Sequence, residues 1–308
     1  MWSKFAAKTG DGWVAVVRRM ARLDVARVVR VTGGRPEILA LDSFQIEGEE
    51  SESLGRLAKS KFLQRNQCVT LLGEVDYRLV QVDAPTVPAE ERVQALRWRL
   101  KDMVDFPVET AALAVADIPT DAGRQASVFV VAAAAATVSG CMAKFAQAKI
   151  NLQAIDIPEM ALRNVAVLFE EPNRGLAFLL LSEDHSLLVI TYKGELYLSR
   201  RIDMTAEALS PEDSERRLAI RERLALELQR TLDNFDRQYG FISVSRLVVA
   251  TEKDSAGLVA ALGENLYLPL LAMDLSDVAD FSTLPELRQL ERQAQGVLAI
   301  GAALRTAI

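Results

Sequence analysis

Histidine and cysteine are nearly absent from this chain of 308 residues, which contains one histidine and two cysteines. Cys68 and Cys141 lie far apart with no CxxC spacing, and His185 has no cysteine or second histidine near it. Zinc sites need several such ligands at short spacings, so the sequence excludes a zinc site. A hydrolytic triad would depend on His185 alone, and no nucleophile-elbow motif surrounds a serine. Triad hydrolysis therefore does not fit the sequence.

Positive charge and long hydrophobic runs are also lacking. The chain has 36 Lys and Arg against 42 Asp and Glu, a net charge of −6 that disfavours nucleic acid as a partner. The longest apolar stretch, Ala126–Val138, is shorter than the roughly 20 residues that a membrane helix requires. The first residues, Met1–Lys8, are too short and too polar for a signal peptide. We therefore expect a cytoplasmic protein with no membrane span.

Strand and helix patterns alternate through the rest of the chain. Half of the residues are hydrophobic, which is typical of a soluble globular protein, and the length suggests about two domains. Three strand-like runs lie between Gly12 and Ile46 around a Gly33-Gly34 turn, and three more between Leu176 and Ile202 around Lys193-Gly194. The alternation predicts an α/β fold. The repeated three-strand meander predicts two lobes with a common plan.

Helical periodicity marks the segments between and after these meanders. The longest helix is expected after a Ser210-Pro211 start and before a stop at Gly240. The other predicted helices share the same apolar spacing of three and four residues: Ser53–Gln64, Ala89–Val104, Val138–Ala148, Glu159–Phe169, Ala256–Leu262 and Glu286–Arg305.

Three stretches of the sequence have distinctive motifs: residues 95–107 (ALRWRLKDMVDFP), 150–164 (INLQAIDIPEMALRN) and 296–305 (ending in IGAALR). Together they resemble the PilM family of type IV pilus assembly proteins, in particular its MSHA-type (MshI-like) members. Residues 95–107, ALRWRLKDMVDFP, are similar to the family's helix followed by a PFP signature, with Asp105 in place of the first proline. Residues 150–164, INLQAIDIPEMALRN, resemble an extended segment that ends in an aspartate, here Asp156. Residues 296–305 end in IGAALR, similar to the family's C-terminal motif.

The resemblance implies an α/β, actin-like two-lobed fold of the FtsA/PilM type. The first lobe would comprise residues 1–74 with 150–166, the inserted subdomain 75–149, and the second lobe 167–308. The cytoplasmic part of GspL secretion proteins shares this fold. The resemblance also implies a cytoplasmic adaptor that binds the tail of a PilN-like (MshJ-type) inner-membrane protein, with the pilus assembly ATPase as a further candidate partner.

The elements that hold ATP in an actin-like enzyme have lost their chemistry in this sequence. Such an enzyme uses two hairpins with glycine and a metal-holding aspartate, together with a Gly-Gly turn. The first matching stretch, Val17–Arg22, has neither residue type. The second places Leu180 at the aspartate and Ser182 at the glycine, and Ala250–Lys253 replaces the Gly-Gly element. We expect a pseudo-ATPase with no catalytic residue, metal or cofactor; the alternative is a divergent ATPase that binds ATP to regulate pilus assembly.

Charged side chains nevertheless stand beside both hairpins. Glu183 and Asp184 are either displaced metal ligands or exposed turn acids, and the second interpretation is favoured because turns are rich in acidic residues. His185 is likewise expected to be a turn residue rather than a general base. Three arginines of the first hairpin could neutralise phosphate without a metal, but arginines at a strand end usually lie on the surface: Arg18, Arg19 and Arg22.

The predicted helix at residues 89–104 carries a tryptophan on its polar face. At 100° per residue, Trp98 lies opposite an apolar stripe made of Val93, Leu96, Leu100, Met103 and Val104. Trp98 is therefore either covered by a neighbouring subdomain or exposed as an anchor for a partner. We expect the tail to dock where the inserted subdomain meets the first lobe, and Trp98→Ala to weaken that binding. The candidate partner-binding residues are Trp98, Arg92, Arg99 and Phe106.

Overall fold

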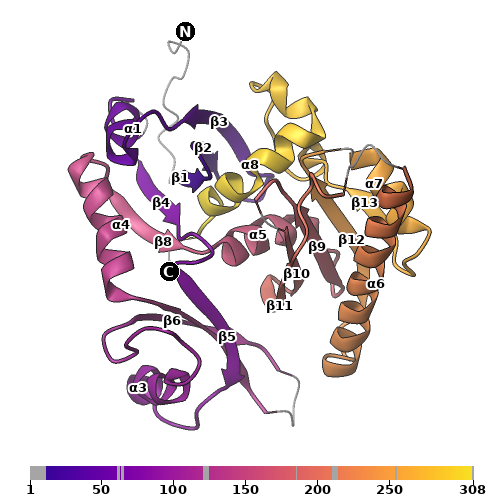
Figure 1. Ribbon diagram of the computed structural model, residues 1–308, viewed down its shortest axis with the longest axis horizontal. Helices are drawn as coiled ribbons and strands as arrows, with labels where there is room; N and C mark the ends of the chain where they lie inside the picture. The colour runs from indigo at the N-terminus through magenta and orange to yellow at the C-terminus, as the bar shows by residue number, and fades with distance from the viewer. Residues whose placement is uncertain are drawn as a thin grey trace.

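The computed structural model describes residues 12–60, 63, 66–120, 125–184, 186–209, 214–253 and 255–306. These residues form three β-sheets with helices packed between and around them (Figure 1). His185 and the predicted helix start at Ser210-Pro211 lie outside the described residues. Within the described ranges, no helix combines the length and the apolar composition needed to cross a bilayer.

The first sheet contains the first predicted meander. Its strand order is β3-β2-β1-β4-β8; β2 is antiparallel to both β1 and β3, whereas β4 is parallel to β1 and β8 is parallel to β4. One face packs against α1 (Glu50–Leu57) and α4 (Ala135–Gln147). The turn at Gly33 has a φ of +70°, as a tight turn requires. The strands are β1 (Trp13–Arg19), β2 (Arg22–Val29), β3 (Glu37–Gln45), β4 (Gln67–Leu71) and β8 (Leu152–Asp156).

The second sheet repeats this arrangement with the second meander. Its order is β11-β10-β9-β12-β13, again with three antiparallel strands followed by two parallel ones. The two meanders therefore lie in separate sheets. Helices α6 (Ser214–Gln238) and α7 (Ser255–Gly263) flank this sheet, on the right of Figure 1. The strands are β9 (Gly175–Leu181), β10 (Ser186–Tyr192), β11 (Glu195–Ile202), β12 (Val244–Thr251) and β13 (Leu270–Ala272).

Between β4 and β8 the chain forms a third sheet, helix α3 (Ala89–Leu100) that packs on it, and α4, which packs on the first sheet. The sheet has the antiparallel order β5-β7-β6, with β5 (Tyr77–Asp83), β6 (Ala112–Ile118) and β7 (Ser127–Ala133). Helix α3 covers one face of it, at the lower left of Figure 1.

The predicted stripe on α3 is only partly buried. Leu96 and Leu100 are fully buried against the sheet, whereas Val93 is 41% and Met103 50% exposed. The reason is geometric: the helix ends at Leu100, before Met103, and only its Leu96–Leu100 side reaches the strands.

Two helices cross between the first and second sheets and join them. Helix α5 (Pro158–Ala166) packs against β9 and β10, and α8 (Leu290–Ala303) against β1, β2 and β12. At their crossing a Cβ on Gly301 would lie 2.0 Å from the carbonyl oxygen of Ala161, so only glycine permits this approach. Both lobes contribute to one continuous hydrophobic core. Helix α8 belongs to residues 167–308, the predicted second lobe, and it packs against both the first sheet and the second sheet.

Candidate functional site

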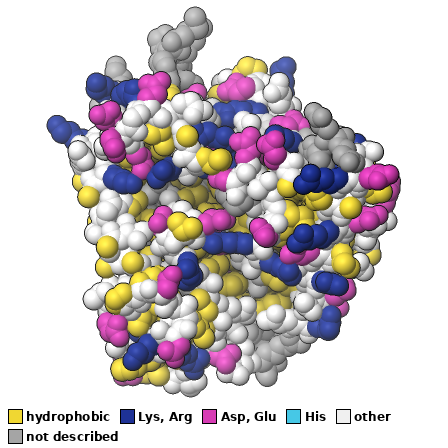
Figure 2. Space-filling model, viewed as in Figure 1, with side chains coloured by type: hydrophobic (Ala, Val, Ile, Leu, Met, Phe, Trp, Pro, Cys, Tyr) yellow, Lys and Arg dark blue, Asp and Glu magenta, His cyan; other side chains and the backbone are white. Residues whose placement is uncertain are grey.

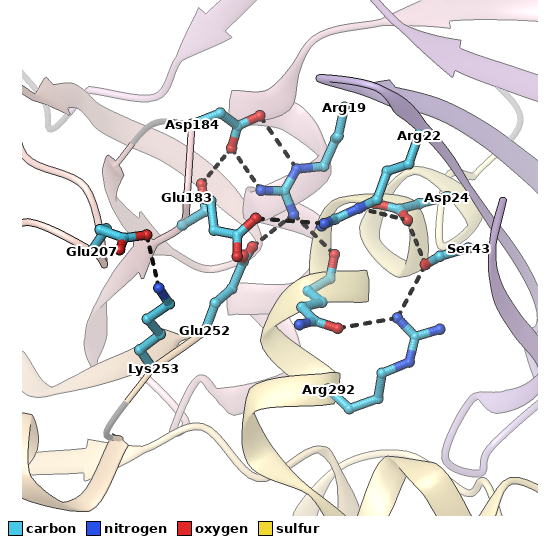
Figure 3. A network of polar contacts seen from close by, with 12 residues as sticks. Arg19, Arg22, Asp24, Ser43, Glu183, Asp184, Glu207, Glu252, Lys253 and Arg292 are labelled. Atoms are coloured by element: carbon cyan, nitrogen blue, oxygen red, sulfur yellow. Dashed lines mark hydrogen bonds and ion pairs between the residues drawn. The ribbon is translucent and has the colours of Figure 1, made fainter. Parts of the chain in front are cut away.

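The two predicted hairpins face each other across the cleft between the lobes (Figure 3). Arg19, the last residue of β1, is 4% exposed and extends into the second lobe. Its Nη2 donates to Asp184 Oδ1 at 2.6 Å, and its Nη1 to Glu252 Oε1 at 2.7 Å and to the Gln295 carbonyl at 3.0 Å. Arg19 thus joins the first lobe to the β9–β10 hairpin, to the end of β12 and to α8.

This arrangement corrects the expectation that Arg19 lies on the surface. The second lobe covers the end of β1, and a single strand pattern gives no sign of that cover. Asp184 is not a free turn acid either, because it accepts from Arg19 and from Ser182 Oγ at 2.8 Å. Arg18 does lie on the surface, with its side chain 58% exposed and 3.5 Å from Glu50.

A second arginine extends the cluster toward α8. Arg22 Nε donates to Asp24 Oδ1 at 3.2 Å, and Arg22 Nη1 lies 3.7 Å from Glu183 Oε2 in the second lobe. Ser43 Oγ donates to Asp24 Oδ1 at 2.6 Å and accepts from Arg292 of α8 at 3.1 Å. Charged and polar side chains from both lobes therefore fill this part of the cleft, as Figure 3 shows.

The protonation of Arg19 is fixed by its neighbours. Burial lowers the pKa of its guanidinium, but the hydrogen bonds and charges of Asp184 and Glu252 outweigh burial and raise the pKa above the usual value. Arg19 is therefore a cation throughout the physiological range, and both contacts are ion pairs.

The positions expected to correspond to nucleotide-binding elements have contacts within the protein instead. Leu180 is fully buried in the hydrophobic core, and Thr251 Oγ1 donates to the Lys253 carbonyl at 2.9 Å. Within the described residues no group of three or more His, Cys, Asp or Glu side chains is arranged to hold a metal ion. The cluster has four carboxylates against three arginines (Arg19, Arg22 and Arg292), and carboxylates repel phosphate where no cation intervenes: Asp24, Glu183, Asp184 and Glu252.

A groove of about 370 Å³ lies between the inserted sheet and α5. Two edge strands line it, β6 of the inserted sheet and β8 of the first sheet. Figure 2 shows hydrophobic side chains around a hollow near the centre of the face of the molecule that is turned to the viewer. Small and aliphatic side chains form most of the lining: Ala112, Ala114, Ala116, Val131, Ala133, Val138, Ile155 and Met160.

The polar end of the groove is held by contacts with neighbouring residues. Arg305 Nη1 lies 2.7 Å from Asp156 Oδ2, which brings together two of the three stretches that resemble PilM. Asn164 Nδ2 donates to the Gly301 carbonyl at 2.9 Å, and Arg163 Nη2 lies 3.1 Å from Glu195 Oε2. The side chains at this end are therefore oriented without a ligand.

The predicted partner-binding residues do not form one surface with the groove. Trp98 is 70% exposed and lies beside Arg97 and Lys101 in a separate hollow of about 100 Å³. Strand β7 separates the two places, because Val128 and Val130 pack on the α3 side whereas Val131 and Ala133 line the groove. A short segment that fills the groove therefore does not reach Trp98.

The other three candidates have partners of their own in the inserted segment. Arg92 pairs with Asp117, and Arg99 Nη1 donates to the Asp83 carbonyl at 2.7 Å. Phe106 is half-buried against the cluster around Leu96 and Leu100, so it contributes to packing.

A buried polar junction was not identified from the sequence. The Tyr77 hydroxyl of β5 donates to Glu159 of α5, and Arg201 Nη2 of β11 lies 3.3 Å from Glu159 Oε1. Burial and the Glu159 charge raise the pKa of Tyr77, so its hydroxyl stays protonated as a donor. The three residues are far apart in sequence, and although Glu159 lies in the PilM-like stretch 150–164, nothing in that stretch indicates a contact with Tyr77 or Arg201.

Comparison with solved structures places this architecture in a known fold class. A chain of the PilM–PilN type IV pilus biogenesis complex superimposes with a TM-score of 0.72, at 22% identity, over 95% of this chain and 98% of that chain. The fold is actin-like. The repeated strand order of the two main sheets agrees with this assignment and confirms the predicted fold class.

More distant structures were also found. The cytoplasmic domain of EpsL, an inner-membrane component of the type II secretion system of Vibrio cholerae, has a TM-score of 0.49 at 15% identity, with 92% of this chain and 93% of that chain covered. A protein with actin-like ATPase fold from Bacteroides thetaiotaomicron has a TM-score of 0.49 at 11% identity, with coverage of 92% and 97%. No protein-family model and no curated protein matches the sequence.

Proposed function

We propose that this protein is a non-catalytic, cytoplasmic adaptor of the inner-membrane assembly platform of a type IV pilus, of the MSHA type. Its partner is the N-terminal cytoplasmic tail of a PilN-like (MshJ-type) membrane protein. The likeness in fold to a chain of the PilM–PilN complex supports this assignment, together with the resemblance of the sequence around Asp156 and Arg305.

One observation carries the non-catalytic part of the proposal: Arg19 occupies the cleft with its own ion pairs. Its guanidinium spans from the first hairpin to Asp184 and Glu252, where an actin-like ATPase holds phosphate and metal. A nucleotide that entered would have to break both pairs, of which the one with Glu252 is buried, and approach uncompensated carboxylates. The ATPase alternative is favoured by the fold class alone, and fold does not determine activity.

The groove between the inserted sheet and α5 supports the peptide-binding part. An extended tail can add its backbone to the edge strand β6 and place apolar side chains over the alanine floor. The small size of Ala112, Ala114 and Ala116 leaves room for large side chains from the partner. The sequence predicts Trp98 as a contact of the tail, but Trp98 lies on the other side of the inserted sheet from the groove. We therefore propose that it contacts a second protein, for which the assembly ATPase is a candidate.

Two titrations test this function. The first titration uses calorimetry with a peptide from the tail of the PilN-like protein of the same genome. We expect one peptide to bind per protein chain. Magnesium ATP at millimolar concentration is expected to give no binding heat and to leave the melting temperature within about 1 °C, since stabilisation follows ligand affinity. A rise of several degrees with ATP would support the ATPase alternative.

A further inference from the structure

We propose that Arg19 is a built-in latch that closes the two lobes in place of a bound nucleotide, and that α8 transmits this closure to the groove. The latch itself is independent of which ligand the protein binds. Only the identity of the groove's occupant rests on the proposed function.

The contacts of Arg19 meet the requirements of a latch. Its three acceptors lie 165, 233 and 276 residues away in sequence, and none belongs to the sheet that carries Arg19. The Glu252 side chain is 0% exposed, and among the described residues its Oε2 has no hydrogen-bond partner. Arg19 is therefore the group that neutralises this buried carboxylate, and its loss leaves an uncompensated charge in the closed cleft.

Neighbouring arginines do not have this role. Arg18 is exposed and pairs with Glu50, in contact with solvent, where ion pairs contribute little. Arg22 reaches the second lobe only at 3.7 Å from Glu183, which is 38% exposed. The adjacent position 18 therefore offers a matched control for position 19, with the same side chain on the same strand.

Helix α8 connects the latch to the groove. The Gln295 carbonyl accepts from Arg19, and the Gly301 carbonyl, six residues or about 9 Å along the helix, accepts from Asn164 at the groove. The contact between Gly301 and Ala161 fixes α8 against α5 with no spare space. A shift of α8 when the latch opens therefore moves the polar end of the groove, and by linkage an occupied groove favours a closed latch.

The first experiment measures lobe closure by hydrogen–deuterium exchange in the full-length protein. Arg19→Gly is expected to raise exchange at least about tenfold in the β1–β2 and β9–β10 hairpins, whereas Arg18→Gly leaves it unchanged. Guanidinium chloride at about 20 mM, far below denaturing concentrations, is expected to restore protection in Arg19→Gly, and the same concentration of NaCl is not. The latch would be overturned if Arg19→Gly exchanged its hairpin amides at the wild-type rate, or if guanidinium chloride and NaCl had equal effects on that rate.

A second variant keeps the test decisive if Arg19→Gly does not fold. Asp184→Asn preserves shape and removes one charge from the latch, so it is expected to raise hairpin exchange by a smaller factor, about threefold. Glu47→Gln, at an exposed ion pair with Arg56, is its control. Unchanged exchange in Asp184→Asn would contradict the latch.

The second experiment measures coupling to the groove with a fluorescent tail peptide. Arg19→Gly is expected to weaken binding about tenfold, guanidinium to restore it, and Arg18→Gly to bind as the wild type. Wild-type affinity in a protein with open hairpins would overturn the coupling through α8. If the peptide fails to bind the wild type, the proposed function is refuted, and the exchange experiment still decides the latch.

Discussion

The interlobe cleft and the groove are both places where separate parts of the chain come face to face, and they are filled in opposite ways. The cleft is closed by charged side chains, with the nearly buried Arg19 between Asp184 and Glu252. The groove is open, apolar and floored with alanine, with about 370 Å³ of space. From this difference we infer that, in this chain, ligand binding has moved from the cleft to the groove. The five predictions that follow test that contrast.

The largest expected effect comes from breaking the closed cleft. Arg19→Met should lower the free energy of unfolding by about 4 kcal/mol, because two carboxylates lose their partner and one of them is fully buried. Urea denaturation measures the change, and Arg18→Met should stay within about 0.5 kcal/mol of the wild type.

The effect of Arg19 should not depend on pH near neutrality. Its pKa is raised in the folded protein above that of a free arginine, so its contribution is complete below the unfolded pKa, which lies far above neutrality, and is lost only as the pH rises through the still higher folded value. The difference between Arg19→Met and wild type should therefore show no contribution from arginine titration over roughly pH 6 to 9. A loss of the difference in that range would show that the carboxylates, not the arginine, govern the pair.

The crossing of α5 and α8 lies between the cleft and the groove, and a substitution there should lower the stability of the protein nearly as much. Gly301→Ala places a Cβ 2.0 Å from the Ala161 carbonyl oxygen and forces α5 and α8 apart, so we expect a loss of about 3 kcal/mol in unfolding free energy. Gly140→Ala in α4 is the control, since a Cβ there meets no atom within 4 Å. That control should stabilise the protein, by up to about 1 kcal/mol. Equal stabilities for the two variants would contradict the tight crossing.

A large side chain in the open groove should weaken binding of the tail peptide and leave the protein folded. Ala114→Trp places a large ring on the groove floor and is expected to weaken binding of the tail peptide at least thirtyfold, about 2 kcal/mol, in fluorescence anisotropy. Ala136→Trp is the control: Ala136 is exposed in the first turn of α4 and does not line the groove, so this variant should bind the peptide normally. Normal binding by Ala114→Trp would place the tail elsewhere.

The smallest expected effect is at Trp98. The sequence alone predicts weaker tail binding in Trp98→Ala, but its place on the far side of the inserted sheet reverses that expectation for a tail in the groove. We expect affinity within about twofold of the wild type and an unchanged circular dichroism melting curve, because the side chain is 70% exposed. A large loss of affinity would show that the tail extends around the subdomain to α3.

Local patterns predicted much of the fold, whereas the contacts of the site depend on distant residues. The two meanders follow from the alternation of apolar residues along the strands, and their turns follow from Gly33 and Gly194, which adopt a positive φ. Both features can be recognised in short stretches of sequence. Helical angles placed Trp98 opposite the apolar stripe, but they left open whether a neighbouring subdomain covers it. Arg19 was misplaced on the surface because its partners come from elements more than 160 residues away. The pairing of Asp156 with Arg305 was hidden for the same reason, although both lie in stretches that resemble PilM.

The junction of Tyr77, Glu159 and Arg201 has a consequence for the speed of binding. It ties the inserted subdomain, α5 and β11 together at one buried carboxylate, with the Arg201 guanidinium 5.1 Å from the centre of the Tyr77 ring. The two walls of the groove are thereby held at a fixed spacing before any partner arrives. The tail therefore loses most of the conformational entropy on association, because the groove is already preorganised. Encounter frequency, rather than an opening step, should set the association rate, which would rise linearly with peptide concentration in stopped-flow measurements.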